Sequence, residues 1–208
     1  MTAEPISEPI SEPVSQPVSG PRWPVPPPEG WTVDDLHTLP DLPPHTELID
    51  GSLIFVSPQR NIHSIVIDML VTGLRHTAPP ELLVRREMTM VIDRKNGPEP
   101  DVQVVRRSAL KDIGQSSFPA SEVLLAVEVA SPESESRDRT TKPHKYAAAG
   151  IPHYWLVEMA GQDERPVVQV YERGSVTGTY ALTGIHHDRL KITVPFGIDI
   201  DLNAIDEL

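Results

Sequence analysis

The 208-residue chain contains no cysteine, which excludes disulfide bonds, zinc ribbons and thiol catalysis and suits a reducing cytoplasm. It has no apolar run near the roughly 18 residues that a membrane span needs, and its N-terminus lacks the basic-then-apolar layout of a signal peptide. Hydrophobic residues make up only 38%, and the deficit lies mostly in the first thirty residues. We therefore expect a cytoplasmic protein without a membrane partner.

An excess of basic residues is also absent. The chain has 18 Lys and Arg against 30 Asp and Glu, a net charge of −12, which argues against a constitutive, tight nucleic-acid binder. Residues 81–150 differ from the rest, since eleven basic residues there balance eleven acidic ones. If DNA is the partner, the sequence predicts weak or transient binding through this middle segment.

Several common sites are missing. The chain has no Gly-rich phosphate loop, no Gly-x-Ser-x-Gly elbow and no His-Glu-x-x-His pair. Its eight histidines include no i, i+4 pair on an expected helix, and scattered surface positions account for most of them. The candidate chemistry therefore rests on carboxylates.

Proline is abundant in residues 1–30, where variants of a Glu-Pro-Ile-Ser tetrapeptide occur four times before a proline-rich run. Such a segment has too few backbone donors and apolar side chains to form a core. We predict a disordered extension over residues 1–30, more plausibly a solubilising tail than a ligand for a proline-binding partner, and one folded domain over residues 31–208.

The folded part predicts many strands with a few interspersed helices, an α/β (mixed α+β) domain around one central mixed sheet with additional antiparallel strands. The Asp50-Gly51 pair between apolar runs indicates a hairpin. Helices are expected over 33–39, Asn61–Thr77, a segment ending at Gly150, and 203–208; strands over 81–93, 101–106, 123–130, 152–158, 167–172, 179–182 and 190–194.

Glu128 is the only charge in the apolar run 123–130, which is typical of a central strand covered on both faces. A carboxylate buried there costs several kcal/mol unless a cation or donors satisfy it. The competing interpretation is a glutamate at the strand end that pairs with an arginine. Because apolar residues continue past Glu128, we favour a functional carboxylate.

Asp101 begins the neighbouring candidate strand, directly after Pro100. By itself Asp101 is best explained as a strand-capping residue. Period-2 alternation puts Asp101 and Gln103 on one face and Val102 on the other. Beside Glu128 on an adjacent strand, Asp101 would complete the oxygen-rich site that Mg²⁺ prefers.

Lys142 follows Glu128 by fourteen residues, at the expected start of the helix that packs back toward that strand's end. A lysine there suits contact with a scissile phosphate or an attacking water. Taken alone, a surface lysine is the simpler explanation, and spacing does not separate Lys142 from Lys145.

An ordered set of short motifs resembles the bacterial Uma family of restriction-endonuclease-like proteins, a branch of the PD-(D/E)XK nuclease superfamily. The resemblance covers roughly residues 31–205. Its motifs are Glu47-Leu-Ile-Asp-Gly, Ser57-Pro58, Pro100-Asp101, Val127-Glu128-Val129, Ser131-Pro132, Asp138-Arg139-x-x-Lys142-x-x-x-Tyr146, and Ala149-Gly150-Ile151-Pro152-x-Tyr154-Trp155.

The resemblance implies a restriction-endonuclease-like core, a metal role for Asp101 and Glu128, an additional acidic role for Glu47, and Lys142 as the site lysine. His63 matches a position where the family often has a histidine, and we treat it as a weak site candidate. The superfamily lysine two residues after the glutamate is replaced here by Ala130.

We therefore expect an endonuclease that hydrolyses DNA phosphodiester bonds with Mg²⁺, or with Mn²⁺ in its place. Asp101, Glu128 and Lys142 are the expected catalytic residues, and Asp101, Glu128 and Glu47 the expected metal ligands. The alternatives are a non-catalytic module that retains the nuclease fold to bind DNA or protein, and an interaction protein whose proline tail is the working part. A homodimer fits this nuclease class, although no residue demands it.

Overall fold

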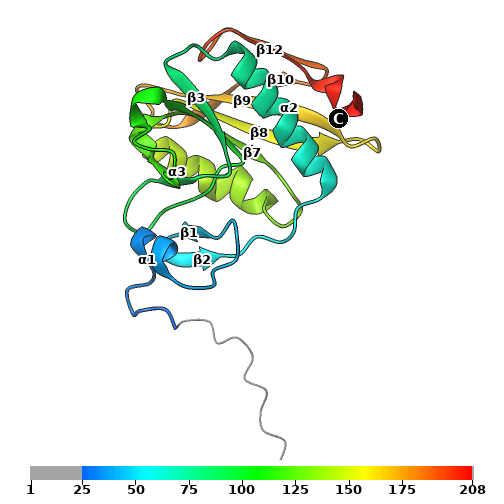
Figure 1. Ribbon diagram of the computed structural model, residues 1–208. Helices are drawn as coiled ribbons and strands as arrows, with labels where there is room; N and C mark the ends of the chain where they lie inside the picture. The colour runs from blue at the N-terminus through cyan, green and yellow to red at the C-terminus, as the bar shows by residue number, and fades with distance from the viewer. Residues whose placement is uncertain (1–24, 208) are drawn as a thin grey trace, which may run out of the picture.

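The computed structural model describes residues 25–207, so most of the predicted extension, residues 1–24, lies outside the described residues (Figure 1). The first helix, α1 (Val33–Thr38), confirms the prediction over 33–39 to within one residue. Its N-terminus is fixed by a capping box. The Thr32 hydroxyl accepts a hydrogen bond from the Asp35 N–H, and the Asp35 carboxylate accepts one from the Thr32 N–H.

A six-stranded mixed sheet forms the centre of the molecule, which confirms the expected fold class (Figure 1). Only the β7–β8 pair is parallel, and every other neighbouring pair is antiparallel. In spatial order the strands are β10 (Tyr180–His186), β9 (Arg165–Arg173), β8 (His153–Ala160), β7 (Val123–Val129), β5 (Val102–Arg106) and β3 (Leu82–Arg86).

The two faces of this sheet are covered by different helices. The long helix α2 (Asn61–Thr77), predicted with the same bounds, packs its apolar stripe on the face that presents alternate residues of β5 and β7. The short helix α3 (Lys142–Ala148) covers the opposite face through Tyr146, which packs with Ala126. Since side chains alternate along a strand, Glu128 points to the α3 face, as Ala126 does.

Three two-stranded ribbons surround the sheet. The predicted hairpin at Asp50-Gly51 is confirmed as β1 (Glu47–Ile49) and β2 (Ser52–Ile54), and with α1 it forms the lower part of the molecule in Figure 1. The pair β11 (Arg189–Ile192) and β12 (Ile198–Asp201) lies by α2, followed by the short helix η4 (Leu202–Glu207).

The expected single strand over 81–93 is wrong. The strand β3 ends at Arg86 because Glu87 adopts a left-handed backbone with a φ of 50°. The chain then leaves the central sheet, and β4 (Thr89–Val91) pairs in parallel with β6 (Ser117–Pro119). Sequence analysis did not predict β6 or β12.

The helix before Gly150 begins at Lys142, the start that the sequence predicts. One turn of π-helix, Arg137–Thr141, leads into α3, and Pro143 lies in the first turn of α3, where a missing N–H is tolerated. Gly150 follows with a φ of +88°, the left-handed conformation that ends many helices. This π-turn and α3 carry the basic half of the site.

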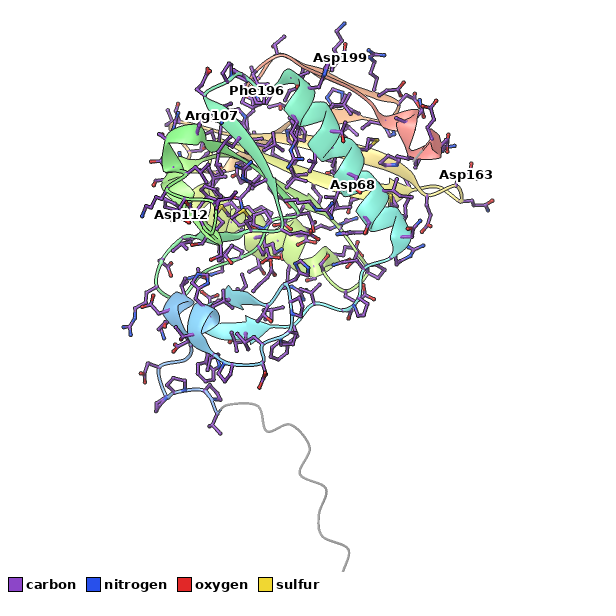
Figure 2. All side chains as sticks on the ribbon, viewed as in Figure 1. Asp68, Arg107, Asp112, Asp163, Phe196 and Asp199 are labelled. Atoms are coloured by element: carbon purple, nitrogen blue, oxygen red, sulfur yellow. The ribbon has the colours of Figure 1, made fainter. Side chains whose placement is uncertain are left out.

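Acidic side chains project from the periphery of the molecule. Asp112, Asp163 and Asp199 are exposed and lie far apart in Figure 2. Across residues 25–207, no helix combines the length and the apolar character that crossing a bilayer requires.

Candidate active site

The antiparallel pairing of β5 with β7 brings the two predicted carboxylates to one end of the sheet. Val102 lies opposite Val127, so Asp101, just before β5, stands next to the C-terminal end of β7. The Asp101 Oδ2 atom accepts a hydrogen bond of 2.6 Å from the Val129 N–H, one residue after Glu128. Backbone pairing and this hydrogen bond fix Asp101 beside Glu128.

Glu128 is 2% exposed, and both of its carboxylate oxygens have partners on α3. Lys142 Nζ donates to Oε2 at 2.9 Å, and the Tyr146 hydroxyl donates to Oε1 at 2.5 Å. Lys142 and Tyr146 are four residues apart, so they lie on one face of the helix. The sequence interpretation that pairs Glu128 with an arginine is not what the structure has.

The Lys142 ammonium group lies at the centre of three carboxyl groups. Its Nζ is 2.8 Å from Glu47 Oε1, 2.9 Å from Glu128 Oε2 and 3.3 Å from Asp138 Oδ1, and the residue is only 4% exposed. We call Glu47, Glu128, Asp138 and Lys142 the carboxylate–lysine cluster. Lys145, the competing lysine, instead pairs with Asp50 at 2.5 Å, outside this cluster.

Burial and neighbouring charges shift the pKa values of Glu128, Asp138 and Lys142. Burial, together with the nearby carboxylates, raises the pKa of Glu128 well above its ordinary value, although Lys142 opposes the shift. Burial also raises the pKa of Asp138. Desolvation opposes the charged form of Lys142, but Glu128, Glu47 and Asp138 outweigh it and raise the pKa of Lys142 well above normal. Lys142 is therefore a permanent cation at neutral pH.

Two histidines support the carboxylates from the rim. His63, buried in the first turn of α2, has its Nε2 atom 3.1 Å from Asp101 Oδ1. His45 lies 2.6 Å from Glu99, whose backbone N–H donates to Glu47 Oε1 at 2.9 Å. Burial raises the pKa of the Glu99 carboxyl despite this histidine. Asp101 and Glu47 are thus each held by a second contact.

The donor chemistry of this site suits a hard divalent cation. Three carboxyl groups surround one ammonium, Asp101 adds a fourth carboxylate beside them, and Asp138 Oδ1 is buried without a hydrogen bond although it lies within ion-pair distance of Lys142. In residues 25–207, no three Asp, Glu or His side chains are arranged to hold a metal ion directly. Lys142 Nζ lies 2.8–3.3 Å from three of these carboxyl groups.

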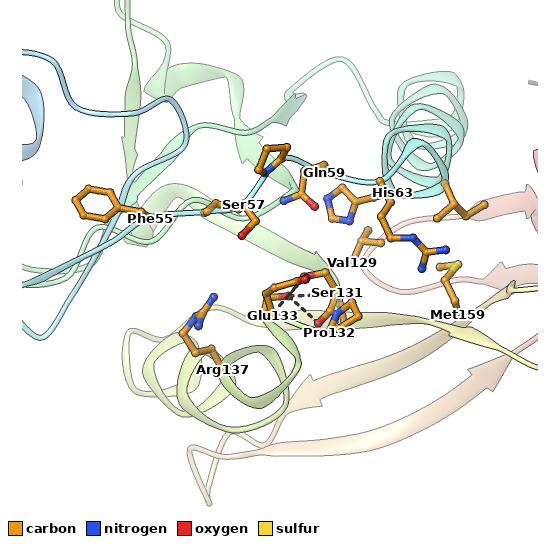
Figure 3. A pocket seen from close by; sticks show the side chains of 16 residues that line it. Phe55, Ser57, Gln59, His63, Val129, Ser131, Pro132, Glu133, Arg137 and Met159 are labelled. Carbon is orange, nitrogen blue, oxygen red and sulfur yellow. Dashed lines mark hydrogen bonds between the residues drawn. The ribbon is translucent and has the colours of Figure 1, made fainter.

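The cluster opens into a cavity of about 520 Å³ that reaches both histidines and the segment 57–59. A second, smaller cavity of about 150 Å³ adjoins it and shares residues 56–59, His63, Val129, Ser134 and Arg137. Figure 3 shows this second cavity between Ser57, His63 and Ser131, with Arg137 rising from the helical turn opposite. We call these two cavities, which share lining residues, the groove.

The structure brings together all four predicted site residues. Glu47, Glu128 and Lys142 are in direct contact, Asp101 adjoins Glu128 through the Val129 amide, and the weaker candidate His63 contacts Asp101.

Sequence analysis assigned no site role to Asp138 and Tyr146, although both lie in the motif that carries Lys142. The signal was present, because residues 138, 142 and 146 follow one another at i, i+4 spacing along one helical face.

Comparisons with known proteins identify a family and a similar fold. The model of the Uma2 family, described as "Putative restriction endonuclease", matches residues 33–203. The fold is similar to the crystal structure of a putative nuclease of Anabaena variabilis belonging to DUF820, with a TM-score of 0.63 and 18% identity over 85% of this chain and 97% of that chain. Among curated proteins, no sequence matches the chain.

Proposed function

The chain belongs to the Uma2 family of putative restriction endonucleases, and we propose that its acidic groove hydrolyses DNA phosphodiester bonds with the help of a divalent metal ion. The observation that carries this proposal is a buried lysine surrounded by three carboxyl groups, beside Asp101, at the floor of an open cavity. Mg²⁺ is the ion that such oxygen donors favour, and Mn²⁺ is an expected substitute.

Asp101 and Glu128 would hold the ion, with Glu47 completing the ligands and Asp138 as a further donor. A bound divalent ion would acidify a coordinated water and offset the charge on the phosphate. Hydrolysis forms a bond between a water oxygen and phosphorus and breaks the bond to one sugar oxygen, which takes up a proton.

The elevated pKa of Lys142 argues against a role as a general base. Because the side chain keeps its proton at neutral pH, it cannot take a proton from water. It would instead orient the attacking water or offset the charge that develops on the phosphate. His63 would act indirectly by holding Asp101 in position.

The first test uses the purified full chain on plasmid and single-stranded DNA with Mg²⁺ or Mn²⁺. We expect metal-dependent cleavage that falls at least 100-fold in Asp101→Asn and in Glu128→Gln, because each change removes a charged ligand. Asp163→Asn is the matched control, since this exposed aspartate lies outside both cavities. Equal cleavage by all four proteins would show that the activity does not come from this site.

A non-catalytic binding module is the second candidate, and one observation favours it. Lys142 already gives the buried carboxylates a counter-charge, and Ala130 stands where the superfamily places its lysine. Calorimetry separates the two candidates: the enzyme should bind Mg²⁺ or Mn²⁺ at millimolar concentration or below, and Glu128→Gln should weaken that binding. A chain that binds DNA but neither ion would support the module.

The proposal includes a cytoplasmic location and weak or transient contact with DNA. Cutting both strands of a duplex would be aided by a homodimer with one site per strand. Light scattering of the full chain, with and without a DNA duplex, tests this part. On duplex DNA we expect a mass of about 46 kDa, twice the 23.0 kDa of the chain, plus the mass of the duplex. A monomer under both conditions would overturn the proposed homodimer but not the proposed cleavage of a single strand.

A further inference from the structure

Besides Lys142, and Arg60 which pairs with Glu164, one more arginine lines the groove. Arg137 lines both cavities, at the point where the larger acidic one meets the smaller one. It stands one residue before Asp138, in the π-turn that leads into α3. In Figure 3 its side chain points from that turn toward the segment of Ser57 and Gln59.

Arg137 has no carboxylate partner despite the acidic surroundings. Its Nε atom is buried and makes no hydrogen bond, and within residues 25–207 its guanidinium forms no ion pair. The next arginine in the same turn behaves differently, because Arg139 pairs with Glu135 at 3.1 Å and with Glu158 at 2.6 Å. The carboxylates of Glu128 and Asp138 are instead paired with Lys142.

A partly buried guanidinium without an acceptor is costly, since its desolvated N–H group is left unsatisfied. An incoming anion would supply that acceptor. Arginine presents its donors in a planar fork that matches two phosphate oxygens, whereas the ammonium group of lysine is a point charge. The position of Arg137 also favours a nucleic acid electrostatically. The acidic side chains of the groove repel a polyanion, and a cation at the edge of the groove offsets this repulsion.

We propose that Arg137 binds the phosphodiester group next to the cleaved phosphodiester group, on the same nucleic-acid strand. This contact would fix the register of the strand over the carboxylate–lysine cluster. The smaller cavity, lined by Val129, Pro132 and Met159 on its apolar side, receives the nucleotide attached to that phosphate. This assignment rests on the proposed nuclease function and adds a substrate-binding subsite to it.

The test compares the full-length wild type with Arg137→Gln, Arg137→Lys and Arg139→Gln. Binding to a labelled single-stranded oligonucleotide is measured by fluorescence anisotropy at several salt concentrations in EDTA, and cleavage is measured separately with Mn²⁺. Arg139→Gln is the control because it removes an equal charge from the same turn. Thermal unfolding establishes that each variant is folded.

We expect Arg137→Gln to weaken binding at least tenfold and to lower the slope of log K against log salt by about 0.7, the loss of one single-strand phosphate contact. Arg137→Lys should recover the slope but only part of the affinity, because the charge returns without the bidentate fork. Arg139→Gln should leave the slope unchanged. Inorganic phosphate should compete with the oligonucleotide less well in Arg137→Gln than in the wild type.

The outcomes separate this inference from the proposed function. Cleavage by the wild type with unchanged binding in Arg137→Gln would overturn the subsite and leave the nuclease proposal standing. Binding that depends on Arg137 without any cleavage would support the subsite and overturn the hydrolysis. A wild type that neither binds nor cleaves DNA would overturn both. An equal loss of affinity in Arg137→Gln and Arg139→Gln would overturn the subsite, because Arg137 would then contribute only nonspecific positive charge.

Discussion

At the scale of single residues, Lys142 is the counter-charge on which the buried carboxylates depend. It is the cation that contacts Glu47, Glu128 and Asp138 in the described structure, at 2.8–3.3 Å. A buried ion pair adds little net stability compared with an apolar pair, but loss of one partner leaves an uncompensated charge. The cluster should therefore be sensitive to removal of its lysine.

We predict that Lys142→Met lowers the free energy of unfolding at pH 7 by roughly 3–5 kcal/mol, because three desolvated carboxyl groups lose their cation. The deficit should shrink at pH 5, where the carboxyl groups can take up protons. Urea denaturation at pH 7 and pH 5 measures the free energy of unfolding of both proteins. Lys145→Met is the control, since its pair with Asp50 is exposed. A pH-independent deficit would mean that the loss reflects packing.

The raised pKa of Glu128 gives a second prediction with a defined sign. A carboxyl whose folded-state pKa lies above its unfolded value binds protons more tightly in the folded state, so stability falls as pH rises above the unfolded value of about 4.5. We expect the wild type to lose stability from about pH 4.5 upward through this group, and Glu128→Gln to reduce that loss. Chemical denaturation from pH 4.5 to 8 tests it, with Asp163→Asn as the control.

At the scale of elements, the site depends on how strands and helices meet. Antiparallel pairing of β5 and β7 places Asp101 beside Glu128. The π-turn and α3 supply Asp138, Lys142 and Tyr146. The β1–β2 hairpin supplies Glu47. The helix α2 covers the other face of the sheet and brings His63 to Asp101. The packing of α2 thus affects the site directly.

The close contact of α2 with β12 requires a glycine. A Cβ atom at Gly73 would lie 2.6 Å from Ile200 Cγ1, so Gly73→Ala should destabilise the fold by roughly 1–3 kcal/mol although alanine favours helix. In an Ile200→Ala background the same change should cost less, and a double-mutant cycle on unfolding free energies measures this coupling. Thr72→Ala on the exposed side of α2 is the control. Additive effects would exclude this contact as the cause.

At the scale of the whole molecule, the boundary of the folded domain can be located from its contacts. The Lys95 ammonium donates to the carbonyl oxygens of Glu29 and Gly30, at 2.6 and 2.8 Å, and the Trp31 N–H donates to Gly51 at 2.8 Å. Glu29 and Gly30, which the predicted extension includes, thus contact Lys95 of the predicted domain.

We predict that deletion of residues 1–24 leaves the melting temperature within about 2 °C of the full chain and leaves metal binding intact, because this composition cannot contribute a core. Deletion of residues 1–30 should lower the melting temperature further, since Lys95 loses both carbonyl partners. Calorimetry of the two truncated chains checks this. If the shorter deletion abolishes DNA cleavage while the fold persists, the tail is the working part.

Much of the fold follows from the sequence because its signals are local. Hydrophobic periodicity specifies α2, the Asp-Gly pair specifies the β1–β2 hairpin, and the apolar run over residues 123–130 marks β7. The break after β3 was missed because a positive φ at Glu87 has no sequence signal, glutamate being an uncommon residue there. The strand β6 was missed because three residues ending in proline are too short to show alternation.

The sequence by itself determined that Glu128 is buried among apolar neighbours and that a strand starts next to Asp101, because burial and alternation follow from the order of residues. The pairing of that strand with β7 came from the structure. Only the tertiary structure decided that Lys142, rather than Lys145, reaches Glu128, and that Asp138, Tyr146 and His63 complete the surroundings. Contacts of the site join residues up to ninety-five positions apart in the sequence, as Glu47 and Lys142 are. Strand pairing and helix packing set such distances, and residue spacing along the chain does not encode them.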